Sequence, residues 1–90
     1  MAIISEAFEA SQVSVSSSAV EVAAPSANNE SVVVKNLGPE TVYIGNSGVT
    51  TGQGYPLSPG ESVDGGAVYN EGSIYAITAG GTSTLAAIML

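Results

Sequence analysis

Short apolar segments dominate the chain from residue 30 onward, and glycine, proline or asparagine interrupts them about every eight to twelve residues. Residues 31–36, 41–45 and 73–78 combine Val, Ile, Tyr or Thr in runs of strand length. This spacing is typical of antiparallel β-sandwiches and small barrels. We therefore predict an all-β fold: a small antiparallel β-sandwich or barrel with an extended N-terminal arm.

The first 29 residues differ in composition from the rest of the chain. They contain neither glycine nor tyrosine, whereas residues 30–90 hold all 11 glycines and all four tyrosines. Turn-favouring residues at 25–29 mark the change. We predict an N-terminal arm over residues 1–29, with a short helix followed by added strands, and a compact β domain over residues 30–90.

The pairing of the later strands is predicted from their turns. Residues 73–78 and 83–90 read as a hairpin closed by the glycine-containing turn at 79–82. Residues 52–59 read as a loop because they contain two glycines and two prolines.

Three predicted strands have apolar residues at both odd and even positions, so that both of their faces would be apolar. They are the runs at 32–34, 74–77 and 85–90. A strand that faces solvent on one side normally alternates apolar and polar residues, so this pattern favours contact with another subunit. A closed sandwich whose second faces are partly exposed is the alternative. In a chain of only 90 residues the core is small, which also favours self-association.

Charge and composition exclude several classes of function. Eight acidic residues face a single base, Lys35, which gives a net charge of −7. Nucleic acids and anionic membranes are bound mainly through Lys and Arg, so we expect neither as a partner. The chain has no Cys and no His, which excludes disulfides and the common zinc sites.

Candidates for chemistry are correspondingly few. Glu61 and Asp64 are close in sequence, but at i and i+3 on a strand they point to opposite faces. Asp64, Asn70 and Glu71 offer oxygen atoms for calcium without a known ligand spacing, and turn residues explain them equally well. We predict no enzymatic activity, no catalytic residues, no metal and no cofactor.

Four motifs between residues 32 and 90 resemble small virion structural proteins of tailed bacteriophages, particularly head-decoration (capsid cement) proteins. The motifs are Val34-x-Asn36, Thr41-Val42-Tyr43-Ile44-Gly45-Asn46-Ser47-Gly48-Val49-Thr50, Gly54-Tyr55-Pro56-Leu57-x-Pro59-Gly60-Glu61-Ser62 and Ile74-Tyr75-Ala76-Ile77-Thr78. The resemblance implies a β domain, often trimeric, that sits on the outer surface of the capsid, binds the major capsid protein and bridges capsomers. It implies no active site.

The resemblance also implies that four glycines are structural turn positions, Gly45, Gly48, Gly54 and Gly60. We expect Gly48 or Gly60 to adopt a positive φ angle, which glycine tolerates without strain.

The N-terminal arm carries the residues that we expect to bind a partner, either the shell or a sister subunit. These are apolar positions without an obvious place in a core built from residues 30–90: Ile3, Ile4, Phe8, Val13 and Val15. A second function, in a different class, is a tail- or fibre-associated module that binds host-surface carbohydrate. Tyr43, Tyr55, Tyr69 and Tyr75 would then form the sugar-stacking platform.

Overall fold

The computed structural model describes residues 9–23, 32–66 and 73–89, and within these ranges it contains eight strands and no helix. The strands are β1 (Glu9–Val15), β2 (Val20–Ala23), β3 (Val32–Gly38), β4 (Val42–Gly45), β5 (Tyr55–Leu57), β6 (Ser62–Gly66), β7 (Ile74–Thr78) and β8 (Ser83–Met89). No helix in the described ranges is long and apolar enough to span a membrane.

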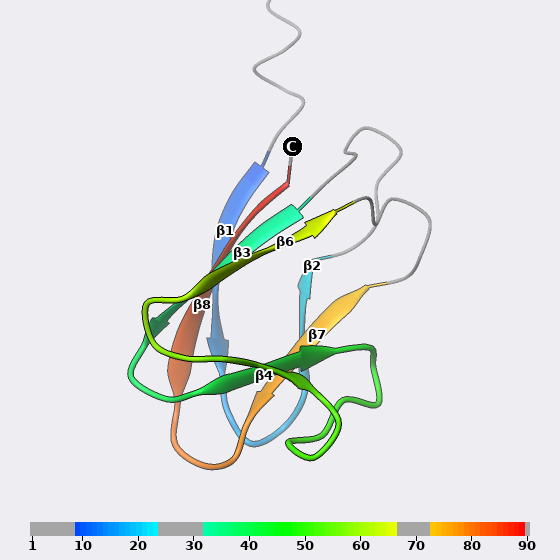
Figure 1. Cartoon of the computed structure of the whole chain (residues 1–90), viewed down its shortest axis with the longest axis vertical. Coiled ribbons are helices and arrows are strands. Elements are labelled where there is room, and N and C mark those ends of the chain that lie inside the picture. Colours follow the sequence, from blue (N-terminus) through cyan, green and yellow to red (C-terminus); the bar gives the residue numbers. More distant parts are fainter. Residues whose placement is uncertain (1–8, 24–31, 67–72, 90) are drawn as a thin grey trace, which may run out of the picture.

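The strands form two four-stranded antiparallel sheets that pack face to face (Figure 1). Sheet A has the order β1-β8-β3-β6, and sheet B has the order β2-β7-β4-β5. Most consecutive strands therefore lie in opposite sheets, in the order found in jelly rolls. The predicted all-β sandwich is confirmed.

Two details of the predicted strand arrangement are wrong. Strands β7 and β8 do not form a hairpin, because β7 pairs with β2 and β4 in sheet B while β8 pairs with β1 and β3 in sheet A. Ala76 on β7 and Leu85 and Ala87 on β8 belong to the same core cluster, each from its own sheet. A short turn can connect two strands in opposite sheets as well as two strands of a hairpin. The predicted loop at 52–59 contains β5, which pairs Leu57 with Val42.

Residues 9–23 of the expected arm belong to this sandwich. β1 is added at the edge of sheet A and β2 at the edge of sheet B. Val15 on β1 is fully buried and Val22 on β2 is 6% exposed, and both pack in the same core cluster as β3 and β8. The compact unit therefore begins before residue 30. The expected short helix was to include Glu9, which is instead the first residue of β1; the part of that helix before Glu9 lies outside the described residues.

Alternation along each strand determines which side chains enter the core. On β3, Val32, Val34 and Asn36 are buried, whereas Val33 is half-buried and Lys35 is exposed. The core cluster consists of small and medium apolar residues: Val15, Val22, Ala23, Val32, Val34, Val42, Leu57, Ala76, Leu85 and Ala87. The alternate residues of the apolar runs, such as Val33, Ile77 and Ile88, consequently face outward and are half-buried.

A buried asparagine joins the two sheets. The Asn36 Nδ2 donates to the carbonyl oxygens of Glu40, at 2.7 Å, and Leu57, at 2.8 Å. Its Oδ1 accepts from the backbone N–H of Gly38, at 2.8 Å, and from the Ser83 Oγ, at 2.7 Å. The side chain is completely buried, so these bonds satisfy a group that water cannot reach.

The expected positive φ occurs at Gly60, where φ is 87°, and not at Gly48. We predict that Gly60→Ala lowers the free energy of unfolding by about 1–2 kcal/mol, since a Cβ disfavours this backbone conformation. Gly80→Ala is the matched control, because a Cβ added at either glycine would meet nothing within 4 Å apart from its chain neighbours, and Gly80 lacks the positive φ. Thermal or urea unfolding should show a loss at Gly60 and no loss at Gly80; equal effects would contradict the assignment.

Candidate partner-binding face

The outer face of sheet A brings together side chains from three strands that are distant in sequence. The register places Ala10, Ile88 and Val33 in one row across β1, β8 and β3. Gln12, Ala86 and Lys35 form the next row. Because side chains in a strand alternate between faces, all six point away from the core.

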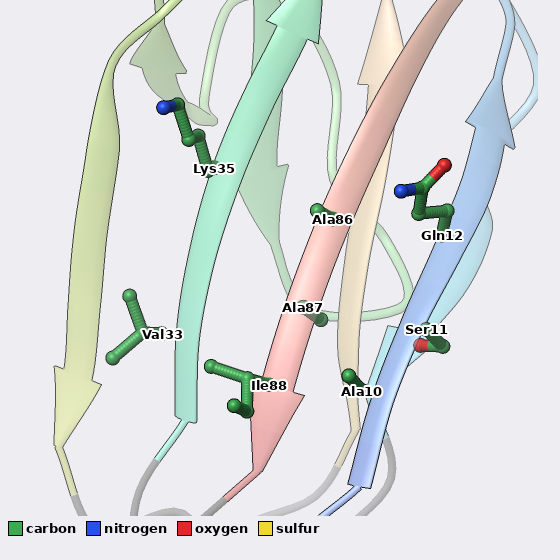
Figure 2. A pocket seen from close by; sticks show the side chains of 8 residues that line it. All are labelled: Ala10, Ser11, Gln12, Val33, Lys35, Ala86, Ala87 and Ile88. Carbon is green, nitrogen blue, oxygen red and sulfur yellow. The ribbon is translucent and has the colours of Figure 1, made fainter.

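These rows form a shallow groove of about 470 Å³ on the outer face of sheet A (Figure 2). Ala86 lies between the longer side chains of Lys35 and Gln12, which leaves the centre of the groove low. Val33 and Ile88 are half-buried and make the adjoining row apolar. Lys35 is exposed at this face and is the only base in the chain. The groove therefore combines an apolar floor with one positive charge on an acidic protein.

The outer face of sheet B is partly covered by the chain itself. Val49 in the β4–β5 loop is 6% exposed although it lies outside the main core cluster. A Cβ at Gly45 would lie 2.9 Å from the Val49 Cγ2, and one at Gly54 would lie 2.7 Å from the Tyr43 Cβ. These two predicted turn glycines thus allow the loop to approach the sheet, which gives both of them a packing role.

Two of the four tyrosines share the outer face of sheet B. Tyr43 lies opposite Ile77, and Tyr75 lies opposite Gly45, so the two tyrosines are diagonal neighbours on adjacent strands. Diagonal neighbours at about 7–8 Å are within reach of aromatic side chains. Tyr55 is 59% exposed on the edge strand β5, and Tyr69 lies outside the described residues.

The predicted partner-binding residues have different positions. Ile3, Ile4 and Phe8 lie outside the described residues. Val13 is half-buried on the edge strand β1. Val15 is fully buried in the core, so its side chain offers no surface to a partner and its role is one of core packing.

Gly48 and Gly60 do not line the groove, whereas Asp64 borders it. The N–H of Gly48 donates to the Asn46 Oδ1 at 2.9 Å, which forms a turn after β4. The N–H of Gly60 donates to the carbonyl oxygen of Asn36 at 2.7 Å and ties its turn to β3. Asp64 lies on β6 opposite Val33, next to the apolar row of the groove, whereas Asn70 and Glu71 lie outside the described residues. Among the described residues, no group of three or more acidic side chains is placed to hold a metal ion.

Sequence reasoning missed the roles of Lys35 and of Asn36. The signal for Asn36 was present, because it shares the parity of Val32 and Val34 and therefore faces the core. For Lys35, alternation along the strand indicates that the side chain points outward. The sequence does not indicate its neighbours, because they come from strands more than 20 residues away in the chain.

A scan against models of protein families finds no match for this chain, and a search of curated proteins finds none either.

Proposed function

We propose that this chain is a non-enzymatic virion structural protein that binds the outside of a tailed-phage capsid and stabilises it by bridging capsomers. The motif resemblance between residues 32 and 90 supports this function. So does the net charge of −7, because an acidic surface avoids non-specific capture by nucleic acid. The partner in this proposal is the major capsid protein.

The outer face of sheet A is the observation that supports the proposal most directly. Half-buried apolar side chains at Val33, Ala86 and Ile88 form a continuous strip on a face that would be solvated in an isolated sandwich. Such a strip, bordered by exposed polar side chains, has the composition of a protein contact. Lys35 beside it would accommodate a carboxylate of the shell protein.

We predict that Ile88→Glu weakens capsid binding about tenfold or more, because it places a charge in an apolar contact that excludes water. Co-sedimentation with assembled capsids, compared with unassembled shell subunits, measures the effect. Ile77→Glu is the matched control, since Ile77 is also half-buried and outward-facing but lies in sheet B. Equal losses in both variants would reject sheet A as the contact, and failure of the unaltered protein to sediment with capsids would reject the function.

A tail- or fibre-associated module that binds host-surface carbohydrate is the second candidate. The adjacent placement of Tyr43 and Tyr75 on one face of sheet B favours it, because sugar rings stack on tyrosines. A glycan array with the unaltered protein, Tyr43→Ala and Tyr75→Ala separates the two functions. Glycan binding that both substitutions abolish, without capsid binding, would favour the carbohydrate module.

A further inference from the structure

The four edge strands of the sandwich differ in how well they are protected against pairing with another chain. Natural sheets protect their edges with short strands, proline, bulges or charged residues. β5 has three residues and contains Pro56. β2 pairs with β7 through a register shift between Glu21 and Ala23, and β6 pairs with β3 through a shift at Val32/Val33. Three edges therefore carry a protective feature.

β1 is the least protected of the four edges. It has seven residues, Glu9–Val15, and contains neither glycine nor proline. All seven residues pair with β8 without a register shift. The only charged residue, Glu9, is the first of the strand. A long, regular and nearly uncharged edge is a template for a further strand.

We propose that this edge pairs with β1 of a second copy of the chain, antiparallel and about a two-fold axis at Gln12. The two copies of sheet A would then form one continuous eight-stranded sheet. This inference concerns the protein alone and does not depend on the proposed function.

The pattern of side chains along β1 fits self-pairing. With Gln12 opposite Gln12 of the second copy, all seven residues of each strand are paired. The side chains at Ala10, Gln12 and Ser14 are exposed and short or uncharged, so they allow the second strand to approach to the usual spacing of about 4.8 Å. Val13, half-buried at this edge, gains cover from the second copy.

Charge selects the antiparallel orientation. The chain carries a net charge of −7, so two copies repel unless their acidic residues are kept apart. Antiparallel pairing separates the two Glu9 positions by about six residues, or roughly 20 Å along the strands. That separation exceeds the Debye length of about 8 Å at physiological salt. Parallel, in-register pairing would instead place the two Glu9 positions side by side.

This contact can join only two copies, because each copy uses the same edge, β1, and no second β1 edge is left for a third copy. It therefore differs from the trimer that the sequence resemblance implies, which needs a contact between two different surfaces. The masses of a dimer and a trimer distinguish the two arrangements.

Sedimentation equilibrium of the full chain at micromolar concentration tests the proposal. Two triple variants are compared: Ala10→Lys/Gln12→Lys/Ser14→Lys, and the same three positions changed to Glu. In a dimer of either variant, position 10 of one copy faces position 14 of the other and position 12 faces position 12, so three pairs of like charges oppose each other. We expect the unaltered protein to be a dimer. In each triple variant the Kd of the dimer should rise about tenfold or more. Mixing the two variants in equal amounts should restore a dimer, because every opposed pair then has opposite charges. Restoration also shows that both variants fold.

The matched control is Ser16→Lys/Ser17→Lys/Ser18→Lys. It changes the net charge by the same amount as the triple Lys variant of β1, but on exposed residues of the adjoining loop. It should remain dimeric. A monomer or a trimer for the unaltered protein overturns the proposal. So does a loop control that dissociates as strongly as the β1 variants, or a mixture of the Lys and Glu variants that stays monomeric.

Discussion

Asn36→Ala is expected to lower the free energy of unfolding by about 3–5 kcal/mol, because it leaves several buried polar groups without partners. The carbonyl oxygen of Leu57 and the Ser83 hydroxyl both bond to the Asn36 side chain in a region closed to water. A domain of this size is stable by only about 5–13 kcal/mol in total. The melting temperature should therefore fall by more than about 12 °C.

Asn46→Ala is the matched control for that experiment. The Asn46 Oδ1 accepts from the N–H two residues later, as the Asn36 Oδ1 does, and the distances are 2.9 and 2.8 Å. Asn46 is exposed, however, so water replaces its lost bond and the expected cost is below about 1 kcal/mol. Equal destabilisation by the two substitutions would show that burial of Asn36 does not determine its contribution.

The fold class could be predicted because alternation and turn residues are local properties. The run Val32–Val34 and the glycine-bounded run at 74–78 both form strands as expected. Strand pairing could not be predicted, because a short turn between two apolar strands fits a hairpin and a crossing between sheets equally well. β5 was missed since Pro56 normally excludes a central strand, although it is compatible with the edge position that β5 occupies.

The candidate partner face was only partly predictable. Apolar residues at both parities indicated that outward positions such as Val33 and Ile88 would need cover. Their juxtaposition with Ala10 depends on the register of β1, β8 and β3, which brings together residues separated by most of the chain. Local sequence patterns do not specify that register when both faces of a strand are apolar.

Removal of the first 29 residues is expected to have the largest effect on stability. A fragment of residues 30–90 lacks β1 and β2 and should not unfold cooperatively. It loses the buried side chains of Val15, Val22 and Ala23 from the core. Burial of the two valines alone contributes about 3–6 kcal/mol, which is a large share of the roughly 5–13 kcal/mol expected for the whole domain.

A fragment of residues 9–90 is the control, because it retains all eight strands. Circular dichroism during heating should show a sharp transition for 9–90 and a gradual one for 30–90. If the arm residues Ile3, Ile4 and Phe8 contact the shell, the 9–90 fragment should also bind capsids more weakly while remaining folded. A sharp transition for 30–90 within a few degrees of the full chain would contradict the structural role of β1 and β2. Those strands would then be a peripheral arm, and β8 and β7 would tolerate exposure of the edges that β1 and β2 now cover.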